Sequence, residues 1–129
     1  MTPIDRIYRI HERMRKVYSL DQGDDRWDAY YKGTPVKILT CNTLHWNGKN
    51  QKGKDVLTKG RFYINYNTHK DLEKEKGLYL FCIYRFINGL VILVDNRIVP
   101  VRYISPLLGK GKNTKLAYGK VFNLPTGKG

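Results

Sequence analysis

Acidic residues are scarce in this sequence. Its 129 residues include 11 Asp and Glu against 24 Lys and Arg, which gives a formal net charge of +13 at pH 7. A charge surplus of this size attracts polyanions and speeds their capture, so nucleic acid is the expected partner. A membrane surface is not expected, because no basic helical pattern carries a continuous bulky apolar face. A basic protein with no polyanionic partner is the alternative.

Long apolar runs, serines and cysteines are also few. No run approaches the length of a membrane span, and the N-terminus lacks the apolar core of a signal peptide. With two serines and no motif around either cysteine, a serine or cysteine triad has no support. Cys41 and Cys82 both fall in strand patterns, which predicts reduced core residues and an intracellular location, in the cytoplasm or a virus-infected cell.

The most regular stretch begins at residue 60. Residues 61–67 alternate between apolar and polar, which predicts a strand. Thr68 stands where a helix N-cap is expected, and Gly77 stands where a left-handed residue would end that helix. His69, directly inside the predicted cap, is expected to be exposed or to contact a phosphate there.

Apolar residues fill 78–84 without interruption, which predicts a strand that is buried on both faces. Asn88-Gly89 is a strong hairpin signal, and residues 90–94 are expected to return beside that strand. Residues 98–104 predict one more strand, and Pro100 limits it to the edge of the sheet.

The N-terminal part predicts a helix over residues 3–19, followed by a β-hairpin. The apolar stripe of the helix consists of Ile7, Ile10, Met14 and Val17. If Tyr31 pairs with Val36 in the hairpin, Asp28 lies opposite Leu39 and Lys37 is its diagonal neighbour. The whole pattern predicts an α/β domain over residues 1–108, built from a small mixed sheet, an N-terminal helix and one crossover helix. A basic extension over residues 109–129 is expected to pack on this domain or to extend from it.

Lysines gather in two segments that flank the predicted core. Residues 42–59 read as a long polar loop, of the length that is typically functional or disordered in compact domains. Trp46 within it is interpreted either as a stacking platform for bases or as an anchor of the loop. The predicted nucleic-acid contacts, besides Trp46, are Lys49, Lys52, Lys54, Lys59, Arg61, Lys110, Lys112 and Lys115.

The predicted order is helix, two-stranded hairpin, strand, helix, strand, strand. It resembles the PD-(D/E)XK nuclease superfamily, which includes restriction endonucleases and archaeal Holliday-junction resolvases. The matching stretches are residues 3–19, 27–40 and 60–85. The resemblance implies a restriction-endonuclease-like αβββαβ core that binds DNA. It also implies Mg²⁺-dependent endonuclease activity on duplex or branched DNA, if the site is complete.

The resemblance assigns Asp28 as the family aspartate and metal ligand, and Glu12 as the acid of the first helix. The acid-x-lysine motif falls on Lys37-Ile38-Leu39, where a lysine replaces the acid and a leucine replaces the lysine. Lys37 would then serve as the catalytic lysine from a shifted position. Two interpretations follow: a further acid (Asp24, Asp25 or Asp55) completes a Mg²⁺ site, or the domain binds without cutting. A plain surface ion pair between Asp28 and Lys37 is the structural alternative.

DNA is favoured over RNA as the partner on the strength of this resemblance. A small RNA-binding protein, with exposed aromatics beside lysines, is a competing hypothesis, and so is a viral architectural protein without catalysis. By analogy with such nucleases, a homodimer is expected to form along the predicted edge strand 98–104.

Overall fold

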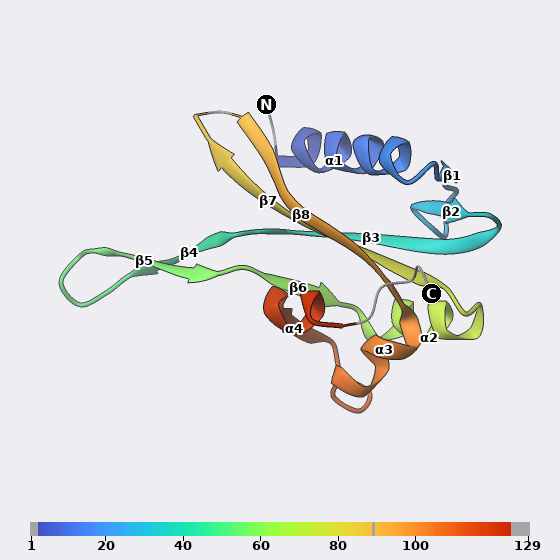
Figure 1. Ribbon diagram of the computed structural model, residues 1–129. Helices are drawn as coiled ribbons and strands as arrows, with labels where there is room; N and C mark the ends of the chain where they lie inside the picture. The colour runs from blue at the N-terminus through green and yellow to red at the C-terminus, as the bar shows by residue number, and fades with distance from the viewer. Residues whose placement is uncertain (1–2, 89, 125–129) are drawn as a thin grey trace.

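A mixed sheet with helices on both faces forms the body of the protein in the computed structural model (Figure 1). The structure describes residues 3–88 and 90–124, and for residues 3–7, 44–49, 55–59 and 86 it describes the backbone only. The helices are α1 (Pro3–Val17), α2 (Tyr66–Lys74), α3 (Val101–Ile104), the 3₁₀ helix η1 (Ser105–Leu107) and α4 (Tyr118–Phe122). The strands are β1 (Asp21–Gln22), β2 (Ala29–Tyr31), β3 (Thr34–Asn42), β4 (Leu44–Lys49), β5 (Asp55–Lys59), β6 (Arg61–Ile64), β7 (Leu78–Ile87), β8 (Leu90–Pro100) and β9 (Thr114–Ala117).

The main sheet has the strand order β1-β2-β3-β7-β8. Its neighbours are antiparallel except β3 and β7, which run parallel and are joined through the crossover helix α2. This arrangement confirms the predicted α/β class and the αβββαβ core. Two ribbons, β4–β5 and β6–β9, stand outside the main sheet.

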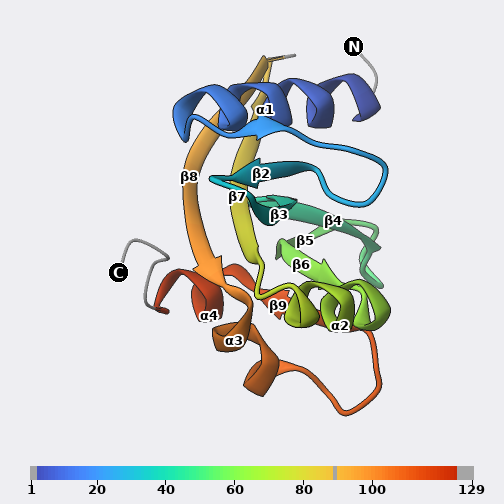
Figure 2. The same ribbon diagram turned by 90° about the vertical axis from the view of Figure 1, so that its right-hand side faces the viewer.

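The helix α1 covers one face of the sheet, while α2, α3 and α4 lie on the other (Figure 2). Ile10 and Met14 of α1 are buried, as the stripe predicted. Val17 is 59% exposed, so its placement on the stripe was wrong, because the helix ends there and turns away from the sheet. The layer under α1 consists of Ile10, Met14, Ala29, Val36, Ile38, Leu80, Cys82 and Ile98.

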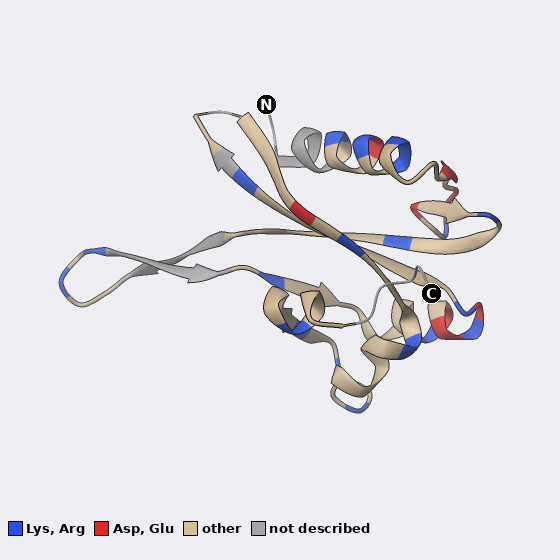
Figure 3. Cartoon of the chain, viewed as in Figure 1, with Lys and Arg blue, Asp and Glu red and all other residues tan. Residues whose placement is uncertain are grey.

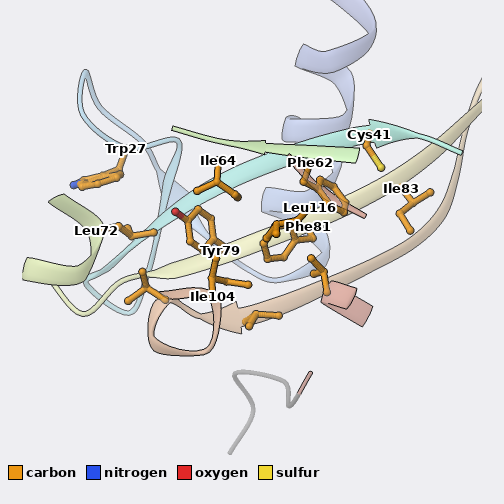
Figure 4. Packing of buried hydrophobic residues seen from close by; sticks show 13 residues of the cluster. Trp27, Cys41, Phe62, Ile64, Leu72, Tyr79, Phe81, Ile83, Ile104 and Leu116 are labelled. Atoms are coloured by element: carbon orange, nitrogen blue, oxygen red, sulfur yellow. The ribbon is translucent and has the colours of Figure 1, made fainter. Parts of the chain in front are cut away.

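The second core layer lies on the opposite face and draws on residues far apart in the chain (Figure 4). Phe62 of β6 meets Phe81 of β7 edge to face, with ring centroids 4.8 Å apart. Leu116 of β9 and Val121 of α4 are buried in the same cluster. Residues on both faces of β7 are therefore buried, as the uninterrupted apolar run predicted.

Both ends of α2 differ from the prediction. The N-cap is Asn65, whose side-chain oxygen accepts a hydrogen bond from the Thr68 backbone N–H at 3.0 Å, so Thr68 is not the cap. At the other end Lys76, not Gly77, takes the left-handed conformation, with φ of 51°. The Gly77 N–H then donates to the Leu72 carbonyl at 2.9 Å, which closes the helix.

The first hairpin has a tighter turn than expected. Tyr31 pairs with Thr34, not Val36, and Lys32 and Gly33 both have positive φ, of 48° and 85°. Such a pair matches the right-handed twist of the strands. The register differs from the prediction by two residues, so the alternation of β2 and β3 is kept, and Asp28 comes to lie beside Lys37.

Two further segments correct the sequence-based expectations. Residues 98–104 are not one strand, because β8 ends at Pro100 and α3 begins at Val101. The strand order places β8 at an edge of the sheet. The expected long loop 42–59 forms the antiparallel pair β4–β5, which projects from the body of the protein (Figure 1). The sequence of this hairpin is too polar to show a strand alternation.

Gly60, at the junction of β5 and β6, packs closely against the backbone of Asn42 at the base of the β4–β5 hairpin. An added Cβ would lie 1.8 Å from the Asn42 carbonyl oxygen, which is backbone and cannot rotate away. We expect Gly60→Ala to lower the free energy of unfolding by about 1–3 kcal/mol in urea denaturation. Gly119→Ala is the matched control, because no atom lies within 4 Å of its added Cβ. Equal stabilities for the two variants would contradict the packing at Gly60.

Candidate functional site

Asp28 and Lys37 come together next to the first hairpin, as the sequence predicted. Asp28 precedes β2, and its Oδ2 lies 3.5 Å from Lys37 Nζ on β3. The same oxygen accepts a hydrogen bond from the Ile38 backbone N–H at 2.7 Å. Both side chains are only partly exposed, at 23% and 33%, so this carboxylate is held in one place. The pair bridges the two strands of the hairpin and therefore also has a structural role.

The helix α1 brings His11 near this pair. Burial lowers the pKa of His11, while the negative charge of Asp28 raises it and the positive charge of Lys37 lowers it. His11 is therefore within electrostatic reach of both groups. Glu12, the predicted acid of this helix, has an exposed side chain. His11 borders the buried residues Ile10 and Met14, whereas Glu12 lies about 160° around the helix from Met14. The spacing of the apolar stripe therefore already indicated that His11, and not Glu12, faces the sheet.

The predicted basic contacts divide between the two ribbons and the turn before β9. Lys52 and Lys54 are exposed at the tip of β4–β5, and Arg61 and Lys115 are exposed on β6–β9. Lys110 and Lys112 are exposed in the turn that precedes β9. The side chains of Trp46, Lys49 and Lys59 lie outside the described residues. All the nucleic-acid contacts, including those of the exposed residues, stay predictions.

His69 is not at the surface, contrary to the expectation. It is 2% exposed, and its Nε2 and Nδ1 lie 2.9 Å from Ser105 Oγ and 2.8 Å from the Tyr79 hydroxyl. Ser105 donates its own proton to Glu73 Oε2 at 2.7 Å. His69 therefore donates from Nε2 to Ser105 and accepts from Tyr79 at Nδ1. The serine proton points to the carboxylate and not to the histidine, so this chain of hydrogen bonds is not a nucleophilic triad.

Metal-binding chemistry is weak among the described residues. No group of three or more His, Cys, Asp or Glu side chains that could hold an ion occurs among them. Cys41 and Cys82 are free and buried, as predicted, and burial raises the pKa of each thiol to about 12. Both thiols are therefore protonated at neutral pH. No helix in the described part of the chain is both long and apolar enough to cross a membrane.

The αβββαβ topology, with an aspartate leading the second strand, points to one family. The family model described as PD-(D/E)XK nuclease superfamily domain matches residues 8–122, nearly the whole chain. This chain belongs to the PD-(D/E)XK nuclease superfamily. No curated protein and no solved structure matches it.

PD-(D/E)XK nucleases typically use a divalent metal ion, but the described residues do not fit one. Mg²⁺ requires oxygen ligands in near-octahedral geometry, and in this superfamily two carboxylates supply the protein ligands. Here Asp28 is joined by a lysine, and one of its oxygens is already held by Ile38. The chain thus belongs to a nuclease superfamily, but its candidate site has a single described carboxylate where the family has two.

The half-buried His11 and the buried His69 predict that the protein loses stability as the pH falls below neutral. Burial lowers the pKa of His11 and of His69, which faces Tyr79, Ser105, Glu73 and Lys70. Below about pH 6.5 the unfolded chain takes up protons that the folded chain does not, so the free energy of unfolding decreases. Each histidine contributes at most about 1.4 kcal/mol per pH unit.

Urea denaturation at pH 7.5 and 5.5 measures this loss. The pKa of Asp24 and that of Glu73 are lowered, so both carboxylates stay ionised across this window and do not obscure the result. His69→Gln should unfold more easily at pH 7.5 and show a shallower dependence on pH. A stability that is constant or higher at pH 5.5 would contradict the assignment of neutral buried histidines.

Proposed function

We propose that this nuclease-superfamily domain binds DNA, duplex or branched, through its projecting β4–β5 hairpin and the neighbouring β6–β9 ribbon. The observation that carries the proposal is the pair of exposed lysines at the tip of a hairpin that extends away from the body (Figure 1). A two-stranded β-ribbon has dimensions that fit the major groove of duplex DNA. Lysines at its tip would neutralise backbone phosphates.

The backbone at the tip of this hairpin is held by hydrogen bonds, so it needs little ordering on binding. Asn50 Oδ1 accepts from the backbone N–H groups of Lys52 and Lys54, at 2.9 and 3.0 Å. The Gly53 N–H donates to the Asn50 carbonyl at 3.0 Å, and φ of Gly53 is 75°. A preformed tip loses less conformational entropy on contact with a ligand.

The distribution of charge supports the same docking side. In Figure 3 the described tip of β4–β5 is basic, while acidic residues lie at the opposite end, around β1 and the loop before β2, and α2 carries both signs of charge. On the β6–β9 ribbon, Tyr63 stands directly opposite Lys115 and Arg61 opposite Ala117. The outward face of this ribbon therefore continues the basic surface from the hairpin into the body.

Replacing both tip lysines tests the contribution of the hairpin. We expect Lys52→Ala/Lys54→Ala to weaken binding to a duplex at low salt. If each lysine neutralises one phosphate, the slope of log affinity against log salt becomes shallower by about 1.8. Lys70→Ala/Lys74→Ala removes the same charge from exposed positions on α2, at the acidic end, and is the matched control. Identical salt slopes for the two variants would exclude the hairpin from the interface.

Hydrolysis is the second candidate activity, supported by superfamily membership and by the Asp28–Lys37 pair. Asp28, Lys37 and Glu12 are the residues proposed for it, with Asp28 as the Mg²⁺ ligand. Because Asp28 is the sole described carboxylate at this pair, we favour DNA binding without hydrolysis.

A competition between duplex DNA, a four-way junction and single-stranded RNA separates the proposed DNA binding from an RNA-binding function.

Incubation of supercoiled plasmid with the protein and Mg²⁺ or Mn²⁺ tests the second activity. We expect gel-shift binding without nicking, since the described residues do not form a metal site. Asp28→Asn is the informative variant, because an amide oxygen can still accept from the Ile38 N–H. Nicking by the wild type that Asp28→Asn abolishes would establish a metal-dependent endonuclease and overturn the expectation.

Location and assembly complete the proposal. We infer an intracellular protein, in the cytoplasm or a virus-infected cell, and the two free, buried thiols support this. The edge strand β8 exposes Leu90, Ile92 and Val94, at 66%, 45% and 50%. These apolar side chains on an edge strand of the described sheet support a homodimer that forms along β8, in place of the expected edge 98–104.

A further inference from the structure

Tyr63 is an exposed aromatic side chain held in one orientation. It lies on the outward face of β6 and is 51% exposed. Its hydroxyl accepts a hydrogen bond from Asn113 Nδ2 at 2.6 Å. The carbonyl oxygen of the Asn113 side chain accepts from the Tyr66 backbone N–H at 2.8 Å. The ring is thereby connected to the start of α2, although nothing in the core requires a tyrosine at this position.

A cavity of about 270 Å³ opens beside this ring. It is lined by Lys37, Leu39, Tyr63, Ile64, Asn65, Thr68 and Tyr79. Leu39 and Ile64 supply an apolar wall, and Lys37 supplies a cation that is one-third exposed. The hydroxyl of Tyr79 is engaged by His69, so it does not leave an unpartnered polar group in the wall. The cavity therefore combines an aromatic edge, an aliphatic wall and a positive charge.

We propose that this cavity receives a single unpaired nucleotide of a DNA strand, with its base stacked on Tyr63. The proposal rests on the DNA binding proposed above and assigns a further feature to the DNA that is bound. A base offers a flat π-face to the ring and apolar wall, while Lys37 and Lys115 flank the ring for the adjoining phosphates. The volume is slightly below the range of about 300–1,000 Å³ that is typical of drug-sized ligands, which favours one base over a longer segment.

Another cavity, of about 390 Å³, does not suit the same ligand. It is lined by Glu73, Lys76, Gly77, Pro100, Val101 and Arg102. The carboxylate of Glu73 would repel a phosphate, and hydrogen bonding to Ser105 keeps the pKa of Glu73 low, so this charge persists at neutral pH. No aromatic side chain lines it. Of these two cavities, the Tyr63 cavity offers a stacking surface and a cation, and no carboxylate is part of its lining. Its cation, Lys37, is also paired with Asp28, which lies outside that lining.

The test compares two DNA duplexes of equal length, one fully paired and one with a single extra nucleotide. The extra nucleotide is 2-aminopurine, whose fluorescence falls when it stacks on an aromatic ring. We expect the wild-type protein to bind the second duplex about tenfold more tightly, from one base–aromatic stack, and to quench its fluorescence. Tyr63→Leu should lose both the preference and the quenching.

Two further variants make the result specific. Tyr8→Leu is the matched control, because Tyr8 is similarly exposed, at 57%, but lies on α1 across the sheet; it should behave as the wild type. Asn113→Ser leaves the ring in place but removes its anchor, so the preference should become smaller without disappearing. Circular dichroism establishes that each variant is folded. The fluorescence quenching by the wild-type protein tests the stacking directly, without any variant.

Each outcome decides the question. Equal wild-type affinity for both duplexes, without quenching, would overturn the cavity proposal and leave DNA binding intact. A preference that survives in Tyr63→Leu would also overturn it, because another part of the protein would then recognise the unpaired base. Failure to bind either duplex at low salt would refute the proposed function itself, and the cavity proposal with it.

Discussion

The structure depends on burying both faces of β7 at once. Tyr79, Phe81 and Ile83 point to one side, while Leu80 and Cys82 point to the other, and all are at most 4% exposed. A strand of this kind needs a cover on each face, which α1 supplies on one side and β6, β9 and the later helices supply on the other. The parallel contact of β7 with β3 then fixes where Lys37 stands, level with Tyr79.

This constraint connects the candidate site to the core. Lys37 has its ion pair with Asp28 on one side and borders the Tyr63 cavity on the other. Tyr79, its neighbour across the parallel pair, closes the floor of that cavity and passes a hydrogen bond to His69 beneath. A buried layer of hydrogen-bonded polar groups is costly when one partner is lost, so it holds the cavity wall in a defined position.

The sequence predicted the elements whose signals are local, and it missed those that depend on distant partners. The apolar run of β7 and the alternation in β6 are unambiguous, because burial alone produces those patterns. The β4–β5 pair has too few apolar residues to show an alternation. Pro100 does lie in an edge strand, as interpreted, but it is the last residue of β8, and the chain enters α3 at Val101 instead of continuing the strand to residue 104. The anchoring of Tyr63 by Asn113 joins segments that only the pairing of β6 with β9 brings together.

The predicted Asp28–Lys37 pair is present because the hairpin register differs from the prediction by two residues, which preserves the alternation of the strands. The structure also shows a structural role for this pair, independent of any catalysis. Asp28 closes the hairpin by accepting the Ile38 N–H, and Lys37 balances its charge. A carboxylate with this structural role persists whether or not a second acid accompanies it. Phosphate attraction, in contrast, requires only exposed cations and no metal geometry. Lys52 and Lys54, the proposed phosphate contacts of the hairpin, are separate from Asp28, so loss of a second carboxylate would leave those proposed contacts intact.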